Sequence, residues 1–342
     1  MAMHVGLIGC GKIGQKHLQA LARLPEAVLV ATCDTSLERA EAAGVPFDAT
    51  AYREPLDLLR HEGLDAVIVA TPSGLHPEQA MAAMEQGLDV LVEKPLALSL
   101  DVARTLTQFA QDAGIILAVT HFNRLLAAPQ KLLSLVRAGA LGPLLSGGVA
   151  VRWARPQVYF DEAAWRGTRA MDGGMLFNQA VHALDLAVAV FGPAAEVFAY
   201  ADTKTHAIEA EDVVAGTVRF RSGALMTVSA TTSVPRTNLE ERLTVVGADG
   251  VAVLGPTAGE LAMLRTANPD QDAEVLRELA ERPAEPTWAS HRSALEDFLE
   301  AVATRQPPML SAASTLDALA LVDALTRSAQ EHRVVVLEEG GA

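Results

Sequence analysis

Asn178, His182 and Asp185 are spaced so that they follow one face of a predicted helix, at about Gly174–Val190. Asn178 and His182 are four residues apart and share a face, and Asp185 lies about one turn beyond His182. Histidine exchanges a proton near neutral pH, so this face could serve general acid–base chemistry. A polar stripe that hydrogen-bonds inside the protein is the alternative explanation.

A glycine motif near the start of the chain indicates a nucleotide site. Gly9-Cys10-Gly11-Lys12-Ile13-Gly14 follows a predicted strand and opens a predicted helix, and Asp34 closes the next strand. Such glycines permit a tight turn and let the backbone approach a pyrophosphate at the helix N-terminus. The Asp34 carboxylate can accept hydrogen bonds from ribose hydroxyls and would repel a 2′-phosphate. We therefore expect NAD as cofactor, with NADP less favoured; a glycine turn beside a surface aspartate is the alternative.

Two further polar segments follow predicted strands of the same region. Ala70-Thr71-Pro72-Ser73 with His76 follows one strand, and Glu93-Lys94-Pro95 follows the next. Ligands of open α/β sheets bind at the carboxyl ends of the strands, where both segments lie. Lys94 is therefore placed to meet a ligand, although a solvated surface lysine is the simpler alternative for this residue alone.

With its GxGxxG motif followed by Glu93-Lys94-Pro95, the chain resembles the glucose–fructose oxidoreductase/inositol dehydrogenase/MocA (Gfo/Idh/MocA) family. The resemblance extends over essentially the whole chain and includes Asn123-Arg124, the Gly139–Gly142 turn and the stretch Gly173–Asp185. It implies an NAD(P)-dependent dehydrogenase. Such an enzyme transfers a hydride between nicotinamide and a secondary alcohol of a sugar, sugar acid, polyol or nucleotide-linked sugar.

The motifs and the resemblance together assign roles to individual residues. Lys94 and His182 are the expected catalytic residues. Cofactor contacts are expected from Gly9, Gly11, Lys12, Ile13, Gly14, Asp34, Thr71, Pro72, Ser73, His76, Glu93, Lys94, Asn123 and Trp165. Substrate contacts are expected from Asn178, Arg124, Arg152, Arg166 and Asp185.

The chain departs from many relatives at Asn178, where they carry an aspartate. A histidine–carboxylate relay is therefore absent at that position. Asn178 is similar to the residue found in the branch that oxidises nucleotide-linked sugar acids, although the variant is not confined to that branch. An amide can position a sugar hydroxyl but cannot store a proton. His182 is thus the expected base on this face, with Lys94 as its electrostatic partner.

The resulting hypothesis places a substrate alcohol between two domains, against the nicotinamide. His182 removes the hydroxyl proton as the hydride leaves, and Lys94 stabilises the developing alkoxide; positioned proton transfer contributes about 10²–10⁴-fold. Proton transfer shared by Lys94 is equally compatible with the sequence. Two other functions stay open: a glycosidase that uses NAD transiently, and a dinucleotide-binding regulator without turnover.

Arginine and aromatic residues are concentrated in one segment of the second region. It holds Arg152, Arg155, Arg166 and Arg169, with Trp153, Tyr159, Phe160 and Trp165 between them. Arginine forks suit carboxylates and phosphates, which favours an anionic or nucleotide-linked sugar. In relatives, the pair that matches Trp165-Arg166 also reaches the cofactor. Ion pairing with nearby Asp161, Glu162 and Asp172 is the competing explanation.

The elements that must position these residues fall into two regions. Before about residue 123, apolar runs alternate with helical stretches. The runs are His4–Ile8, Val28–Cys33, Ala66–Ala70, Val90–Val92 and Ile115–Thr120, and the helices are Gln15–Leu24, Leu37–Ala43, Pro77–Gln86 and Leu100–Ala113. Thr35 and Glu38 have capping-box spacing, and Ser99 can cap the last of these helices. Apolar strands that alternate with helices predict a doubly wound parallel sheet of the Rossmann type.

After about residue 123 the pattern changes to hairpins, which predict an α+β domain with an open-faced, mostly antiparallel sheet and helices on one face. The expected hairpins are Val213–Phe220 with Leu225–Ala230 and Leu243–Gly247 with Val251–Leu254. Helices at about Ser290–Thr304 and Ser314–Gln330 precede a strand at Val334–Leu337, and residues 267–287 resemble an exposed excursion. We expect an NAD(P)-binding domain at 1–122 and a substrate-binding and oligomerisation domain at 123–342. Packing of about 314–342 back on the first domain is left open.

The bulk composition limits the possible partners. The 342 residues are 50% hydrophobic and carry a formal net charge of −15, which argues against general binding to nucleic acid or anionic membranes. Cys10 and Cys33 indicate neither a disulfide framework nor a metal site, and no metal is expected. No spacing supports a role for His17, His61, His206, His291 or His332. Without a recognisable signal peptide or spanning helix we expect a cytoplasmic enzyme, and an open sheet face predicts a homodimer or homotetramer.

Overall fold

The computed structural model describes residues 2–283 and 286–338. The chain divides into two compact units, each built from two stretches: Met1–Phe122 with Glu285–Leu316, and Asn123–Ala284 with Asp317–Ala342. The chain first passes from one unit to the other between residues 122 and 123, where the domain boundary was expected. The sequence analysis placed residues 285–316 in the second domain and considered a return of 314–342 to the first. The contacts instead group Glu285–Leu316 with the first unit and the following tail with the second.

The first unit is built on a parallel sheet, which confirms the predicted Rossmann-type fold. In the described part of this unit, six strands lie in the order β3 (Thr50–Tyr52), β2 (Ala27–Cys33), β1 (Met3–Ile8), β4 (Ala66–Val69), β5 (Asp89–Val92) and β6 (Leu117–Val119). The residues of β4 and β5 are all buried, as expected when helices cover both faces of a parallel sheet. The short β3 was missed by the sequence analysis.

Helices connect these strands. They are α1 (Lys12–Leu21), α2 (Leu37–Gly44), α3 (Pro55–Leu58), α4 (His76–Glu85) and α5 (Leu100–Ala113). The predicted capping box of α2 was wrong: Ser36, not Thr35, is the N-cap, and its side chain accepts a hydrogen bond from the Arg39 amide at 3.3 Å. Ser99 occupies the N-cap of α5 but makes no capping hydrogen bond through its side chain.

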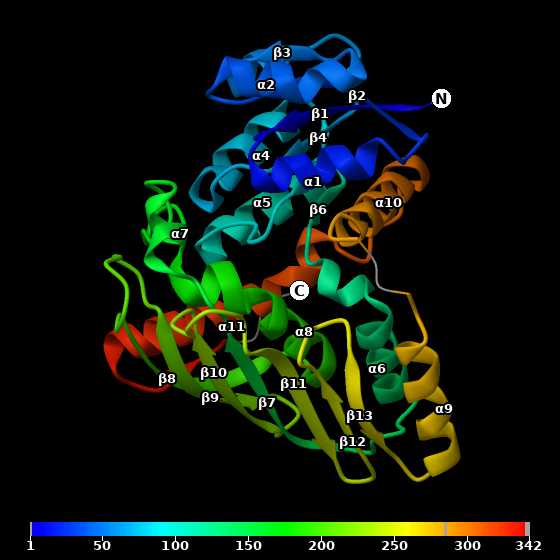
Figure 1. The fold of residues 1–342 in the computed structure, drawn as a ribbon, viewed down its shortest axis with the longest axis vertical. Coiled ribbons are helices and arrows are strands. Elements are labelled where there is room, and N and C mark those ends of the chain that lie inside the picture. The colour runs from blue at the N-terminus through cyan, green and yellow to red at the C-terminus, as the bar shows by residue number, and fades with distance from the viewer. Residues whose placement is uncertain (1, 284–285, 339–342) are drawn as a thin grey trace. The chain divides into compact units, whose positions relative to one another are not determined.

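A helix from the far end of the sequence completes the core of the first unit. Leu295, Phe298, Leu299 and Val302 of α10 (Ala289–Thr304) pack into the apolar cluster that contains residues of β1, β2 and α1. Figure 1 shows α10 alongside α1. The first unit therefore depends on residues that follow the first stretch of the second unit in the chain.

The second unit is built on a broad sheet. Over its described residues the strand order is β13 (Leu261–Arg265), β12 (Val251–Leu254), β11 (Glu240–Gly247), β7 (Leu144–Arg152), β10 (Leu225–Thr231), β9 (Val213–Phe220), β8 (Ala194–Asp202) and β14 (Val335–Val336). The pair β7–β10 is parallel and the other pairs are antiparallel. Both predicted hairpins and the mostly antiparallel sheet are confirmed, whereas the sequence analysis gave no bounds for β7, β8 and β13.

Helices cover one face of this sheet. They are α6 (Ala127–Arg137), α8 (Val181–Phe191) and most of α11 (Ala312–Glu331), and Figure 1 shows them on the same side of the strands. A Cβ on Gly147 of β7 would lie 2.6 Å from the Phe191 ring, so Gly147 faces α8. On the opposite face Tyr200, Leu225 and Val336 are 62%, 49% and 69% exposed. The predicted open face is thus present.

The remaining helices are α7 (Gln157–Asp161) and α9 (Pro269–Ala280). Helix α9 forms most of the segment 267–287 that was expected to be an exposed excursion; it is capped by Asn268, and most of its residues are exposed although Val275 is buried. Residues 284–285 lie outside the described residues. No helix among those described is long and apolar enough to cross a membrane.

Candidate active site

The glycine motif forms the turn between β1 and α1. Gly9 has φ +98°, and a Cβ there would lie 2.4 Å from the Ala70 carbonyl oxygen. A Cβ on Gly14 would lie 2.1 Å from the Gly9 carbonyl oxygen, whereas one on Gly11 would meet nothing within 4 Å. The first and third glycines are therefore required by packing, and the second leaves open space at the N-terminus of a ten-residue helix. This is the arrangement that a pyrophosphate needs; Lys12 and Ile13 form the first turn of the helix beside it.

Asp34 joins the glycine turn to the end of β2. Its carboxylate accepts hydrogen bonds from the Cys10 amide and the Ser36 amide, each at 3.0 Å. Arg39 lies 3.1 Å away and is half-exposed. The carboxylate is thus fixed beside the turn, where a dinucleotide's ribose hydroxyls would lie.

His76 links the two other strand-end segments of the first unit. Its Nδ1 lies 2.7 Å from the Pro95 carbonyl oxygen and its Nε2 lies 2.9 Å from the Thr71 carbonyl oxygen. Burial lowers the pKa of His76, so the ring is neutral near pH 7 and donates to one carbonyl at a time. Thr71 also donates to Gln79 at 2.6 Å, and Ser73 begins a short 3₁₀ turn after Pro72.

Lys94 is the second residue after the end of β5 and is partly buried. Its amide donates to the Thr120 hydroxyl at 3.2 Å, and the preceding amide of Glu93 donates to the Val69 carbonyl at 2.8 Å. These bonds hold the Glu93-Lys94-Pro95 segment against the ends of β4 and β6. Lys94 therefore lies at the carboxyl edge of the sheet.

The sequence analysis missed a buried cluster of His17, Glu93 and His291. His17 Nε2 lies 2.8 Å from Glu93 Oε1, and His291 Nε2 lies 3.7 Å from the same oxygen. Burial alone would raise the pKa of Glu93, but the hydrogen bond and charge of His17, aided by His291 and Thr120, hold that pKa below its ordinary value. Burial lowers the pKa of His291 to about 4. The three residues come from sequence positions far apart, so no spacing could have indicated the cluster.

This cluster also has the composition of a metal site, since its ligand atoms lie within 4.8 Å of one another. In metal centres, however, the second nitrogen of a ligating histidine is usually hydrogen-bonded. Within the described residues, Nδ1 of His17 and Nδ1 of His291 are buried without a hydrogen-bond partner. The cluster therefore fits a buried carboxylate–histidine pair better than a metal centre.

In the second unit, His182 lies near the start of α8 and is 8% exposed. The expected continuous α-helix is interrupted: a π-helical turn, Met175–Ala180, precedes α8. Asn178 therefore lies on the π-helical turn, and the simple four-residue spacing does not describe its position relative to His182. Asn178 donates to Asp172, whose other oxygen accepts from the Gly167 amide at 3.0 Å.

Glu211 is a second residue that the sequence analysis missed. Its Oε1 accepts from the Leu176 amide at 3.1 Å, and its carbonyl accepts from the Met175 amide at 3.2 Å. Burial raises the pKa of this carboxyl. Gly174 has φ +81°, and a Cβ there would lie 2.5 Å from the Glu211 carboxylate. Glu211 thus caps the π-helical turn that leads to His182.

Two predicted ligand residues pair with each other. Arg124 Nε and Nη2 donate to Asp185 Oδ2 and Oδ1 at 2.7 and 2.5 Å, and both side chains are almost fully buried. Asn123 donates to Glu241 at 2.9 Å. The Arg124–Asp185 pair ties the beginning of the second unit to α8, one turn beyond His182, which is a positioning role.

The arginines predicted to bind an anion have different surroundings. Arg152 donates to Glu240 and, at 3.1 Å, to Ser229. Since side chains alternate along a strand and Gly147 faces α8, Arg152 lies on the opposite, open face of the sheet, away from α8. Arg166 donates to Glu162 at 2.7 Å and to the Tyr159 carbonyl at 2.6 Å. Its guanidinium carbon lies 5.6 Å from the centre of the partly buried Trp165 ring. Ion pairing, the competing explanation, therefore accounts for part of the segment.

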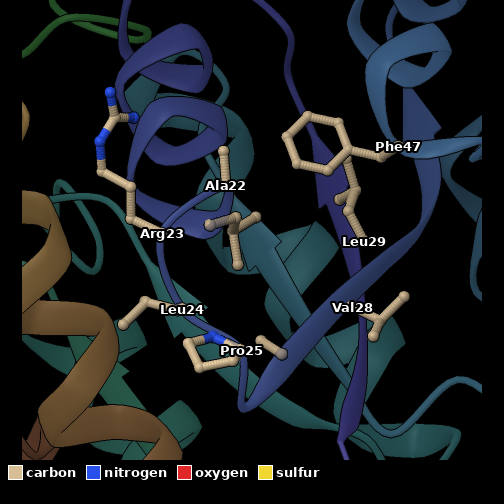
Figure 2. Close-up of a pocket in the computed structure, with 9 residues that line it drawn as sticks. Ala22, Arg23, Leu24, Pro25, Val28, Leu29 and Phe47 are labelled. Atoms are coloured by element: carbon tan, nitrogen blue, oxygen red, sulfur yellow. The ribbon is translucent and has the colours of Figure 1, made fainter.

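A separate apolar crevice of about 500 Å³ lies in the first unit. Figure 2 shows Leu24, Pro25, Val28, Leu29 and Phe47 around it. Val28 and Leu29 lie at the start of β2, whereas Asp34 follows the end of that strand. The crevice holds none of the predicted site residues and is not part of the candidate site.

Two family profiles match the chain. Residues 3–121 match the GFO_IDH_MocA profile, described as an oxidoreductase family with an NAD-binding Rossmann fold. Residues 130–253 match a GFO/IDH/MocA C-terminal domain.

Individual relatives agree with these matches. The crystal structure of the WlbA dehydrogenase from Bordetella pertussis in complex with NADH and UDP-GlcNAcA is 31% identical, with a TM-score of 0.91, over 99% of this chain and 100% of that one. A D-apiose dehydrogenase of Paraburkholderia graminis is 29% identical over 97% of this chain and 89% of its own length. A myo-inositol 2-dehydrogenase of Thermotoga maritima is 27% identical over 98% of this chain and 99% of its own length.

Proposed function

Because the chain belongs to the Gfo/Idh/MocA family of oxidoreductases, we propose that Lys94 and His182 carry out its dehydrogenase reaction. The reaction oxidises a secondary alcohol of a sugar or polyol to a ketone. Bound NAD supplies the acceptor of the hydride that leaves the alcohol carbon. The hydroxyl proton goes to His182, so that a hydride and a proton together leave the substrate.

The observation that supports this most directly is the glycine turn of the first unit. Its open space at Gly11, the N-terminus of α1 and the fixed carboxylate of Asp34 fit the pyrophosphate and ribose of a dinucleotide. Lys94 follows a strand of the same sheet, at the edge where such ligands bind. The glycine turn would thus hold the cofactor at the edge of the sheet that also carries Lys94.

Lys94 and His182 have separate roles in this proposal. The Lys94 ammonium donates a hydrogen bond to the reacting oxygen and stabilises its developing negative charge. His182 accepts the hydroxyl proton as a general base. Asn178, which donates to Asp172, orients a substrate hydroxyl through its own carbonyl oxygen, and Asp172 holds the amide in place.

The test is NADH formation with a panel of neutral sugars, polyols, sugar acids and nucleotide sugars, including UDP-GlcNAcA. With the best substrate, Lys94→Ala and His182→Ala should each lower kcat by at least about 10²-fold. NAD binding, followed by protein fluorescence, should remain measurable in both variants. If both variants retained near-wild-type kcat with NAD bound, the assignment would be wrong.

The same assay separates the two alternative functions. A glycosidase that uses NAD transiently would release free sugar from a glycoside without net NADH. A regulator would bind NAD and turn over no member of the panel. A dehydrogenase forms one NADH for each alcohol oxidised.

Three further properties belong to the proposal. The first unit binds NAD, and the second unit binds substrate and makes the contacts of a homodimer or homotetramer through its open sheet face. The exposed Tyr200, Leu225 and Val336 support this assembly. A cytoplasmic location is supported by Cys10 and Cys33, which are buried free thiols rather than a disulfide.

A further inference from the structure

Arg155 differs from the two ion-paired arginines of its segment. Arg152 and Arg166 each have a carboxylate partner, Glu240 and Glu162. Among the described residues, the Arg155 guanidinium has no carboxylate within ion-pair distance, and its hydrogen bonds go to neutral oxygens. Because the protein has 42 acidic against 27 basic residues, a half-buried arginine without an acidic partner is notable.

The Arg155 side chain is held in a defined orientation. Its guanidinium carbon lies 4.9 Å from the Trp153 ring centre and 5.3 Å from that of Tyr159. Nη1 donates to the Ala154 carbonyl at 2.9 Å and to Asn238 Oδ1 at 3.3 Å. Within the described chain, Nε donates to no protein acceptor. Aromatic contacts and neutral oxygens therefore orient the charge without neutralising it.

The backbone of Arg155 is fixed as well. Its amide donates to the Thr232 carbonyl at 3.0 Å, and its carbonyl oxygen lies 2.6 Å from His206 Nε2. The other nitrogen of His206 lies 2.8 Å from Asp212, which is fully buried. Little conformational freedom is thus left to be lost when a ligand binds to this arginine.

Arg155 contacts the π-helical turn that precedes His182. Its Nη2 donates to Gln179 Oε1 at 3.4 Å, and Gln179 Nε2 lies 3.3 Å from Asn178 Oδ1. All of these residues belong to the second unit. Arg155 is thus linked through Gln179 to the amide that the proposed function assigns to the substrate, whereas Arg152 lies on the other face of the sheet.

We propose that Arg155 binds an anionic oxygen group of the substrate, and that the substrate is therefore a sugar carrying a carboxylate or a phosphate rather than a neutral polyol. The inference rests on the proposed function. A planar guanidinium with a free Nε edge binds such a group through two charge-assisted hydrogen bonds. The ligand then supplies the negative charge that the surrounding protein does not.

The test compares four probes in NADH formation: UDP-GlcNAcA, UDP-GlcNAc, glucuronate and glucose. UDP-GlcNAcA carries both a carboxylate and a diphosphate, and UDP-GlcNAc carries only the diphosphate. Glucuronate carries only a carboxylate, and glucose carries neither group. Arg155→Gln should raise KM for the anionic substrate about 10- to 100-fold and change kcat less than about threefold. Arg155→Lys should recover only part of the loss, because an ammonium lacks the fork. Arg169→Gln, which removes an exposed arginine of the same segment, is the matched control and should behave like the wild type.

The pattern across the probes identifies the group. A KM effect on both carboxylates and not on UDP-GlcNAc indicates the carboxylate, and an effect on both nucleotide sugars indicates the phosphate. A purely structural role would alter the thermal unfolding temperature and KM for all four probes equally, and that result would overturn the inference. So would a wild-type enzyme that uses glucose as well as glucuronate and UDP-GlcNAcA.

Failure of the proposed function can be told apart from failure of this inference. If the NAD-bound wild type oxidises none of the probes, calorimetric titration with UDP-GlcNAcA still measures the anion site. Binding that Arg155→Gln weakens at least tenfold supports the site, and binding equal in both proteins rejects it.

Discussion

At the end of β2 the carboxylate of Asp34 faces Arg39, whose guanidinium lies 3.1 Å away. The carboxylate excludes a 2′-phosphate, whereas a nearby arginine can bind one once it is released. Asp34→Ser should raise KM for NAD about 10- to 100-fold and shift the ratio of kcat/KM values toward NADP by a similar factor. Steady-state kinetics with both cofactors measure this shift. In the double variant with Arg39→Ala, kcat/KM for NADP should return to its low value, while KM for NAD should stay raised. An unchanged ratio of kcat/KM values for the two cofactors in Asp34→Ser would contradict the role of the carboxylate.

The buried His291 should make stability depend on pH. Its pKa is about 4 in the folded protein, against an ordinary value of 6.5. Between these values the unfolded chain binds the proton and the folded chain does not. The free energy of unfolding should therefore fall as pH falls from about 6.5 to about 4, by up to about 1.4 kcal/mol per pH unit. Urea unfolding at several pH values measures the slope.

The control for this effect is His291→Gln, which removes the titrating group and should reduce the slope in that range. Glu93 has a pKa below its ordinary value of 4.5. Its ionised carboxylate therefore stabilises the folded protein fully above that ordinary value, and this stabilisation is lost only as the pH falls further. An identical slope in the wild type and His291→Gln would show that other groups cause the pH dependence.

At the scale of elements, the π-helical turn depends on how it begins. Gly174 and Gly192 flank the turn and α8 with nearly equal φ, +81° and +82°. An alanine Cβ would meet the Glu211 carboxylate at position 174 and nothing within 4 Å at position 192. Both substitutions carry the cost of positive φ, about 1–3 kcal/mol, but only Gly174→Ala displaces the carboxylate that caps the Leu176 amide.

Gly174→Ala should therefore lose about 1–3 kcal/mol more stability than Gly192→Ala, and its kcat should fall at least about tenfold further because His182 follows the turn. Thermal unfolding and kcat of the two variants provide the comparison. Equal losses in both would mean that backbone strain alone is responsible and that Glu211 has no positioning role.

The elements differ in how far the sequence could predict them. The glycine turn and Asp34 lie within one strand–helix–strand unit, so their spacing determines their geometry. Glycines such as Gly147 and Gly148 weaken the strand pattern of β7, which was therefore given no bounds. The π-helical turn was read as an α-helix because its residues are apolar at helical spacing, while the carboxylate that caps it, Glu211, comes from a distant segment.

Contacts between distant residues could not be read from the sequence at all. The pairing of Glu93 with His17 and His291 depends on α10 packing against α1. The surroundings of Arg152 could not be predicted either, because its ion-pair partner and the sheet face on which it lies follow from the register of the strands rather than from the composition of the segment. Arginine clustering indicated an anion site, but only the contacts separate Arg155 from its paired neighbours.

For the whole molecule, the open sheet face predicts the state of assembly. Leu225 lies on this face, 49% exposed, whereas Leu56, 55% exposed, belongs to the first unit. Leu225→Glu should convert the proposed homo-oligomer into a smaller species, because a charge there would be buried on association. Leu56→Glu should leave the sedimentation coefficient unchanged. A wild-type protein that sediments as a monomer would contradict the assembly.

The position of α10 also determines when the protein can fold during its synthesis. The strands of the first unit leave the ribosome early, but Leu295, Phe298 and Leu299, which complete their core, leave only after strands β7 to β13 of the second sheet. Until then the apolar surface of α1 lacks its partner and is open to chaperones or to aggregation. The unit whose strands are translated first is therefore expected to be completed only after most of the second sheet has been made, and a nascent chain that stops before α10 should remain protease-sensitive throughout its glycine turn.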